Sequence, residues 1–156
     1  MTKTIEESTV RTAGEMRALG RRLARRLRAG DLVVLTGPLG AGKTTLAQGI
    51  GDGLRVRGPV TSPTFVIARV HPSVGSGPAL VHVDAYRLGG AAEVDDLDLD
   101  ADLDHAVTVV EWGEGLVERL TDDRLEVTIG RPPGGGFDDE SRTVRLTGRG
   151  PRWAQR

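Results

Sequence analysis

The chain has 156 residues, of which 38% are hydrophobic, and its formal net charge at pH 7 is -1. This length suffices for one buried core, so we expect a single domain over residues 1–150 and a C-terminal tail at 151–156. The chain contains no cysteine, which excludes disulfides and thiolate metal sites. The near-zero net charge argues against a protein that holds nucleic acid unaided.

The sequence also indicates the cellular compartment of the protein. No apolar run approaches the length of a membrane span, and the first ten residues, MTKTIEESTV, lack the apolar core of a signal peptide. A chain without cysteine is also typical of a reducing environment. The sequence therefore predicts a cytoplasmic protein without a membrane partner.

Residues 15–30, EMRALGRRLARRLRAG, predict an amphipathic helix that ends at a glycine. Its apolar face carries Met16, Leu19, Leu23 and Leu27, and the rest of its surface carries Arg21, Arg22, Arg25, Arg26 and Arg28. The arginines are typical of a solvated helix face, although an interaction surface would have the same pattern. Residues 95–104, DDLDLDADLD, carry the opposite charge and predict an acidic surface connection that is also a candidate docking edge.

The stretch GPLGAGKTT follows the apolar run LVVL and precedes LAQGIGDGL, which predicts a helix. Gly37, Gly42, Lys43 and Thr44 fit the pattern G-x-x-x-x-G-K-[S/T], in the strand, loop, helix order that a phosphate-binding loop, or P-loop, requires. Backbone N–H groups of such a loop and of the helix that follows surround a phosphate. Lys43 is one of two lysines among 21 Lys and Arg residues, so an ammonium here is a specific choice.

This motif assigns chemistry to the loop. Lys43 is a candidate catalytic group that reaches the β and γ phosphates, and the Thr44 hydroxyl is a candidate Mg²⁺ ligand. The candidate nucleotide-binding residues of the stretch are Gly37, Gly40, Ala41, Gly42, Lys43, Thr44 and Thr45.

A second loop, VTSPTFV, presents the hydroxyls of Ser62 and Thr64 on either side of Pro63. It predicts either a switch that orders around the γ-phosphate and Mg²⁺ or a rigid turn. Ser62 and Thr64 are therefore further candidate contacts of the nucleotide.

Three apolar runs, DLVVLTG, ALVHVDAY and AVTVVEW, predict strands of a largely parallel sheet. Asp84 and Glu111 end two of these runs and are candidate catalytic acids, with Glu111 at the position from which an acid holds Mg²⁺ directly or through water. His82 and Tyr86 share one strand side with Asp84, and we expect packing roles for both rather than catalysis. Trp112 is either a core aromatic or a nucleotide contact.

The C-terminal runs RLEVTIG and SRTVRLTG flank RPPGGGFDDE and predict a hairpin with a long loop. Together with the P-loop, this pattern predicts the α/β class and the P-loop NTPase fold within it. The expected architecture is a three-layer sandwich with a mostly parallel sheet and an antiparallel C-terminal addition, in one ATPase domain over residues 1–150.

In their order and spacing, GPLGAGKTTLAQGIGDGL, VTSPTFVI, HVDAYRL, AEVDDLDLD and VVEWGEGL resemble the bacterial TsaE (YjeE) ATPases over residues 8–120. The resemblance implies a Mg²⁺-dependent ATPase that joins a TsaB–TsaD complex, in which threonylcarbamoyl passes from its adenylate to the adenosine beside the tRNA anticodon. Contact with tRNA would run only through that complex. The resemblance also implies that Thr44 and Glu111 hold Mg²⁺, that Asp84 is needed for activity, and that Thr9 approaches the adenine.

Two alternatives stay open. A small-molecule kinase shares the loop but needs a lid with several arginines, whereas Arg87 is the lone arginine near the active strands. A non-catalytic, nucleotide-gated assembly factor would use ATP only to control docking. An ordinary GTPase is excluded, because its guanine-reading Asn-Lys-x-Asp element needs asparagine and the chain has none. Since P-loop ATPases often obtain an arginine finger from a partner, we expect slow hydrolysis by the isolated chain.

Overall fold

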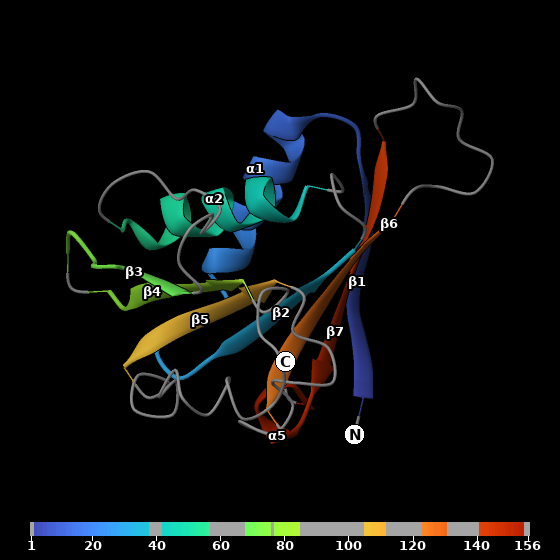
Figure 1. Ribbon diagram of the computed structural model, residues 1–156. Helices are drawn as coiled ribbons and strands as arrows, with labels where there is room; N and C mark the ends of the chain where they lie inside the picture. The colour runs from blue at the N-terminus through green and yellow to red at the C-terminus, as the bar shows by residue number, and fades with distance from the viewer. Residues whose placement is uncertain are drawn as a thin grey trace.

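The computed structural model describes residues 2–37, 42–56, 68–75, 77–84, 105–111, 123–130 and 141–154, leaving aside the side chains of residues 2, 68, 69, 84 and 154. These residues form a seven-stranded sheet with the strand order β1-β7-β6-β2-β5-β4-β3 (Figure 1). The strands are β1 (Thr2–Val10), β2 (Leu32–Thr36), β3 (Ala68–His71), β4 (Ala79–Asp84), β5 (Ala106–Glu111), β6 (Arg124–Gly130) and β7 (Arg142–Arg149). The helices are α1 (Ala13–Ala24), α2 (Lys43–Leu54) and α5 (Pro151–Ala154).

The sheet is mixed. Strands β6, β2, β5 and β4 pair in parallel at its centre, as the three apolar runs predict for β2, β4 and β5. The predicted C-terminal hairpin is confirmed, because β6 and β7 pair in antiparallel fashion. The prediction of a mostly parallel sheet is corrected: β1 adds to β7 and β3 folds back on β4, both antiparallel, so antiparallel pairings are as frequent as parallel ones.

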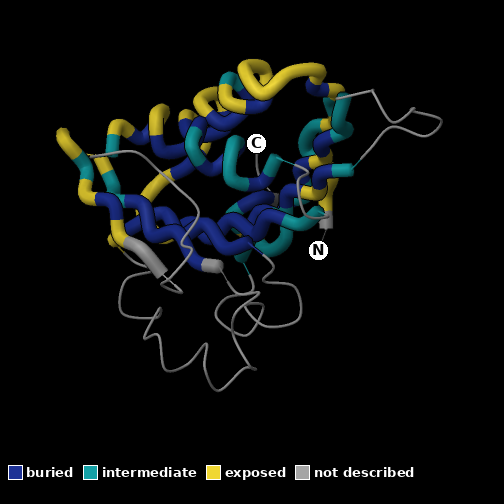
Figure 2. Tube along the Cα trace, turned by 45° about the horizontal axis from the view of Figure 1, so that its top comes forward, coloured by how far each residue is buried: buried dark blue, intermediate teal, exposed yellow. Residues whose placement is uncertain are grey.

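The central strands are buried on both faces. All six residues of β5 and the first four of β2 are buried, which is why these segments are continuous apolar runs rather than alternating ones. Figure 2 shows this centre in dark blue, with the exposed segments concentrated on the outer sides of the helices. The core therefore lies between the sheet and the pair α1 and α2, where their apolar side chains meet.

Helix α1 begins and ends on identifiable hydrogen bonds. At its start, Thr12 Oγ1 accepts from the N–H of Glu15 at 3.0 Å, a typical N-cap. The predicted apolar face is buried, but the helix ends well before Gly30, because the N–H groups of Arg26 and Leu27 bond to carbonyls three residues back. Leu27 is still buried, so the apolar spacing continues past the helix end.

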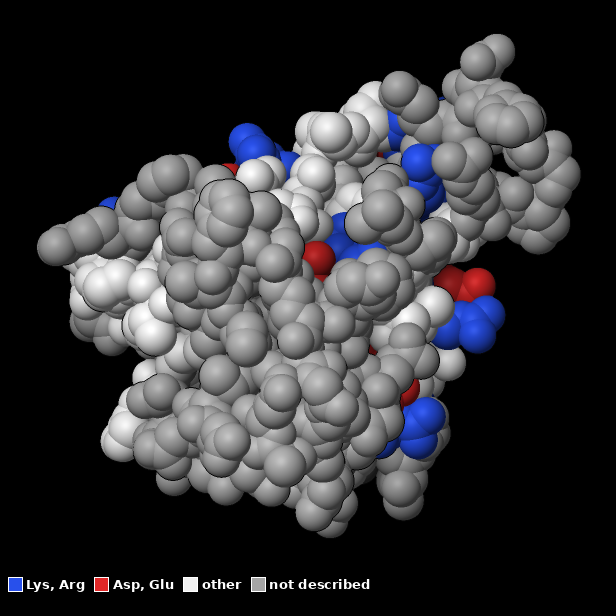
Figure 3. Space-filling model, viewed as in Figure 1, with Lys and Arg blue, Asp and Glu red and all other residues white. Residues whose placement is uncertain are grey.

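The arginines of α1 and of the residues that follow it are exposed, and several of them contact acids of neighbouring elements. Arg22 and Arg26 contact Glu6 of β1 at 3.0 and 3.5 Å, and Arg21 contacts Asp52 of α2 at 3.8 Å. Figure 3 shows the same mixture of charge along the edge beside β1 and β7, where acidic and basic atoms lie next to one another. This pairing fits the interpretation of a solvated helix face.

Helices α1 and α2 cross at very short range on one face of the sheet (Figure 1). A Cβ added at Gly20 of α1 would lie 2.5 Å from the Leu46 carbonyl oxygen of α2. A Cβ at Gly49 of α2 would collide with the Arg17 carbonyl oxygen of α1. Only glycine permits this approach, which holds α2 closely against α1.

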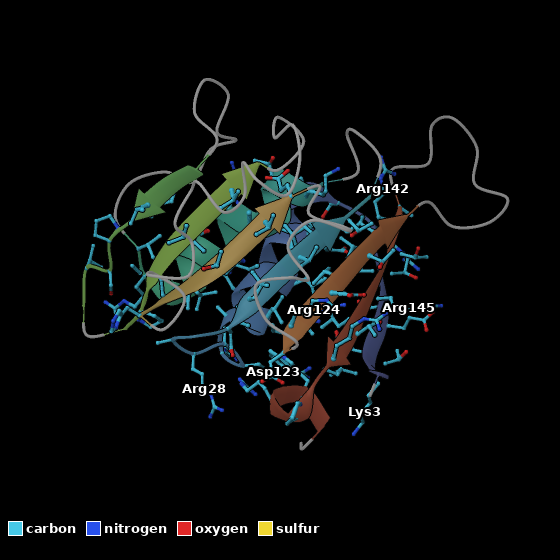
Figure 4. All side chains as sticks on the ribbon, turned by 60° about the horizontal axis from the view of Figure 1, so that its bottom comes forward. Lys3, Arg28, Asp123, Arg124, Arg142 and Arg145 are labelled. Atoms are coloured by element: carbon cyan, nitrogen blue, oxygen red, sulfur yellow. The ribbon has the colours of Figure 1, made fainter. Side chains whose placement is uncertain are left out.

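Helix α5 packs against β7, β6 and β1. Arg152 donates from Nε and Nη2 to the two carboxylate oxygens of Asp31, at 3.0 and 3.1 Å, and its backbone N–H donates to Asp123 Oδ1 at 3.0 Å. Figure 4 shows Asp123 beside α5. Trp153 is buried, so packed structure continues beyond the boundary predicted at residue 150. None of the three described helices is long and apolar enough to cross a membrane.

Candidate nucleotide-binding site

The loop between β2 and α2 has the strand, loop, helix order that its sequence predicts. Gly42 caps α2 in a left-handed conformation, with φ 110° and ψ 16°, which favours glycine. A Cβ at this position would also approach Met16 Cε of α1 to 3.1 Å. Gly42 thus turns the chain into the first turn of α2, where backbone N–H groups have no partner within the helix itself.

Lys43 lies at the start of α2 with only 5% of its surface exposed. Its Nζ donates to the Gly37 carbonyl oxygen at 2.6 Å, so the ammonium joins the two ends of the loop. Burying an ammonium is costly unless oxygen atoms surround it. Lys43 therefore places a buried positive charge beside Gly37, where the phosphate-binding motif begins.

Glu111 ends β5 and is also 5% exposed. Its Oε2 lies 3.5 Å from Thr44 Oγ1, in the first turn of α2. The hydroxyl and the carboxylate come from residues 67 positions apart in the sequence, and the fold brings them to the same edge of the sheet. Both are oxygen ligands of the kind that Mg²⁺ prefers.

His82 of β4 makes the shortest described contact of Glu111. Its Nε2 lies 2.5 Å from Glu111 Oε2, and the imidazole is completely buried. The sequence predicts a packing role for His82 and no contact with Glu111. The available signal is strand alternation: His82 and Asp84 share one side of β4, which lies beside β5 in parallel register, with Asp84 opposite Glu111.

The residues present fit a Mg²⁺ ion bound together with a phosphorylated ligand. Among the residues that the structure describes, no group of three or more His, Cys, Asp or Glu side chains could hold a metal by itself. Mg²⁺ commonly takes only one or two protein ligands and completes its octahedron with phosphate and water. The pair of Thr44 and Glu111 meets that requirement.

A pocket of about 170 Å³ lies between β1 and α1, on the same helix whose Met16 packs beneath Gly42. Thr9 lines it, with Ser8, Val10, Glu15, Ala18, Leu19 and Arg22. Thr9, for which the family resemblance implies a place near the adenine, thus lines a cavity. A second cavity of about 200 Å³ lies further along α1 and is lined by Glu6, Arg22, Arg25 and Arg26 among others.

Comparisons with known proteins agree on one family. The family model "Threonylcarbamoyl adenosine biosynthesis protein TsaE" matches residues 10–135. A Streptomyces coelicolor protein named "tRNA threonylcarbamoyladenosine biosynthesis protein TsaE" is 68% identical over 140 residues, which cover 89% of this chain and 94% of the relative. A Bacillus subtilis protein of the same name is 36% identical, with 89% of this chain and 83% of the relative covered.

The chain belongs to the TsaE family. It is therefore a protein of tRNA threonylcarbamoyladenosine biosynthesis. Among solved structures, "Crystal structure of Bacillus subtilus YdiB" superposes with a TM-score of 0.73 at 30% identity and covers 99% of this chain and 91% of that one. The α/β fold with a mixed sheet is therefore shared with that structure.

For this TsaE family member, the structure brings together Gly37, Gly42, Lys43, Thr44 and Glu111 around the β2 to α2 loop. Asp84 ends β4 in register with Glu111. Thr45 is half-buried in the first turn of α2. The remaining predicted contacts, Gly40, Ala41, Ser62, Thr64 and Trp112, lie outside the described residues, as do Tyr86 and Arg87.

Proposed function

We propose that this TsaE family member is a Mg²⁺-dependent P-loop ATPase that supports threonylcarbamoylation of the adenosine next to the tRNA anticodon. In this proposal it acts with a TsaB–TsaD complex, and tRNA is reached only through that complex. The observation that carries the ATPase assignment is the buried Lys43 ammonium, 2.6 Å from the Gly37 carbonyl oxygen. A lysine enclosed by this motif is the group that grips phosphate oxygens in P-loop proteins.

Binding would proceed through exchange of partners. The Lys43 ammonium leaves the Gly37 carbonyl for the β and γ phosphate oxygens, and first-turn N–H groups of α2 donate to the same phosphates. Mg²⁺, when bound, neutralises charge on the phosphates. Thr44 and Glu111 are the residues that would hold it, and the pocket lined by Thr9 would take the adenine.

Hydrolysis needs a group that orients the attacking water toward the γ-phosphorus. Asp84 is the proposed group, since it ends β4 in register with Glu111, which ends the neighbouring β5. Water adds to the γ-phosphorus, the bond to the ADP oxygen breaks, and ADP and inorganic phosphate leave. The predicted contacts Ser62, Thr64 and Trp112 remain part of this proposal.

Calorimetry of Mg²⁺-ATP binding tests the assignment. Lys43→Ala should abolish tight binding, because the variant loses the only enclosed positive charge among the described loop residues. Lys3→Ala is the matched control, since Lys3 is the other lysine and is exposed on β1. Unchanged affinity in Lys43→Ala would exclude the loop as the ATP site.

A further inference from the structure

His82 is an unusual residue for its surroundings. It is fully buried in the middle of β4, where Leu80, Val81 and Val83 are apolar. Its Nε2 meets Glu111, but its Nδ1 is buried and has no hydrogen-bond partner in the part of the chain that the structure describes. An unpaired buried nitrogen is unfavourable, so an aliphatic side chain would suit packing at this position better.

The hydrogen bond to Glu111 explains why a histidine occupies this buried position. A carboxylate only accepts hydrogen bonds, so Nε2 carries the hydrogen and donates it to Oε2 at 2.5 Å. Thr44 Oγ1 reaches the same oxygen only at 3.5 Å, a much weaker contact. Both of these contacts are to Oε2, so His82 holds that oxygen of the carboxylate and does not engage Oε1.

We propose that His82 is a positioning residue, which fixes the Glu111 carboxylate so that it can bind a divalent cation together with Thr44. This inference rests on the proposed function, because it assigns the cation to the nucleotide site. When Thr44 turns its oxygen toward the cation, it gives up its weak contact with Glu111, and the hydrogen bond from His82 keeps the carboxylate in place. Hydrogen bonds to a ligating carboxylate typically change metal affinity about 10–100-fold.

The test is a Mg²⁺ titration of the protein saturated with a fluorescent, non-hydrolysable ATP analogue. His82→Leu should weaken the apparent Mg²⁺ affinity about 10–100-fold, while affinity for the analogue in excess EDTA stays at the wild-type value. His82→Gln should restore most of the Mg²⁺ affinity, because its amide places an N–H donor near the position of Nε2. A merely structural role would lower both affinities together and would not be rescued by the amide.

Thr108→Val is the matched control. Thr108 is a fully buried polar residue of neighbouring β5 whose hydroxyl has no partner among the described residues and does not touch Glu111. Its replacement should leave Mg²⁺ affinity unchanged. Should His82→Leu fail to fold, His82→Met fills a similar volume without a donor and provides the same comparison with His82→Gln.

Glu111→Gln separates this inference from the proposed function. It should weaken Mg²⁺ binding by itself, and His82→Leu should add nothing further in that background, because the two residues act through one carboxylate. Additive effects, or wild-type Mg²⁺ affinity in His82→Leu, would overturn the role of His82. Wild-type Mg²⁺ affinity in Glu111→Gln would instead remove the proposed cation site itself.

Discussion

Lys43 and Glu111 are buried charged residues that belong to one site. Burial of a charge is unfavourable without compensation, and here the compensation consists of a loop carbonyl, a hydroxyl and an imidazole. The loop carbonyl and the hydroxyl can be exchanged for a phosphate oxygen and a cation, while the imidazole keeps its hydrogen bond to Glu111. This is the arrangement expected of a binding site that is formed before its ligand arrives.

Substitution of Asp84 tests whether this acid and Glu111 have different roles. If it orients water and holds neither nucleotide nor metal, Asp84→Asn should keep ATP affinity but lose hydrolysis by about a hundredfold or more. Binding by calorimetry and steady-state phosphate release measure the two effects separately. Asp52→Asn, on the exposed side of α2, is the control and should change neither. A parallel loss of binding and hydrolysis would make Asp84 a metal ligand or a structural residue.

At the same scale, the sequence predicts the residues of the loop but not the contact between strands. The G-x-x-x-x-G-K-[S/T] pattern assigns Lys43 and Thr44 because the spacing alone constrains that chemistry. The contact of His82 with Glu111 depends on which strands are neighbours and on their register, since β4 and β5 are separated by a long stretch of sequence. Strand alternation places His82 and Asp84 on one side of β4, but the sequence pattern does not say which strand lies beside it.

Among the secondary-structure elements, the close crossing of α1 and α2 leads to the first stability prediction. Gly49→Ala should destabilise the protein by about 2 kcal/mol, because a Cβ there meets the Arg17 backbone oxygen, which cannot rotate away. This loss exceeds the gain of up to about 1 kcal/mol in helix propensity. Gly14→Ala in α1 is the control, since its Cβ would lie 3.7 Å from Thr12 Oγ1 and fits without strain. Urea unfolding compares the two, and equal stabilities would contradict the tight crossing.

Helix α5 provides a second prediction at this scale. Arg152→Ala should lower the free energy of unfolding by about 3 kcal/mol, because it leaves the Asp31 carboxylate, 5% exposed, without its bidentate partner. Arg145→Ala removes an exposed ion pair with Glu7 and should cost less than about 1 kcal/mol. Thermal or urea denaturation measures both. A smaller loss in Arg152→Ala than in Arg145→Ala would show that α5 is not anchored by Asp31.

Whether the sequence predicts an element depends on how fully that element is buried. Strands β2, β4 and β5 are predicted because burial on both faces makes them continuous apolar runs. Strands β1 and β3 lie at the two edges of the sheet, where side chains of β1 are largely exposed and no apolar pattern arises. The end of α1 is misplaced because Leu27 keeps the helical spacing after the chain has left the helix.

At the scale of the whole molecule, the site lies where the inner strands β4 and β5 end at their carboxyl termini, with Asp84 and Glu111 as their last residues. Their carboxyl ends and the β2 to α2 loop converge there. P-loop ATPases often obtain the arginine that stabilises the transition state from a partner, and we propose the same for this protein.

The proposed need for a partner's arginine predicts slow hydrolysis by the isolated chain. Addition of a TsaB–TsaD pair should raise steady-state phosphate release by at least about tenfold, whereas an unrelated protein of similar charge should not. Sedimentation should show assembly with the pair in ATP and weaker assembly in ADP, since only the γ-phosphate form would order the segment with Ser62 and Thr64. Fast turnover that is indifferent to the pair would contradict this prediction and favour a self-sufficient kinase.

The most direct test of the central claim is threonylcarbamoylation of tRNA in a reconstituted reaction that contains TsaB–TsaD, threonylcarbamoyl adenylate, Mg²⁺-ATP and this protein. We expect multiple turnovers of modified tRNA with the wild-type chain and with Lys3→Ala. Lys43→Ala should reduce modified tRNA to the level seen without the protein, with ATP hydrolysis lost in step. Wild-type yield of modified tRNA with Lys43→Ala would contradict the account.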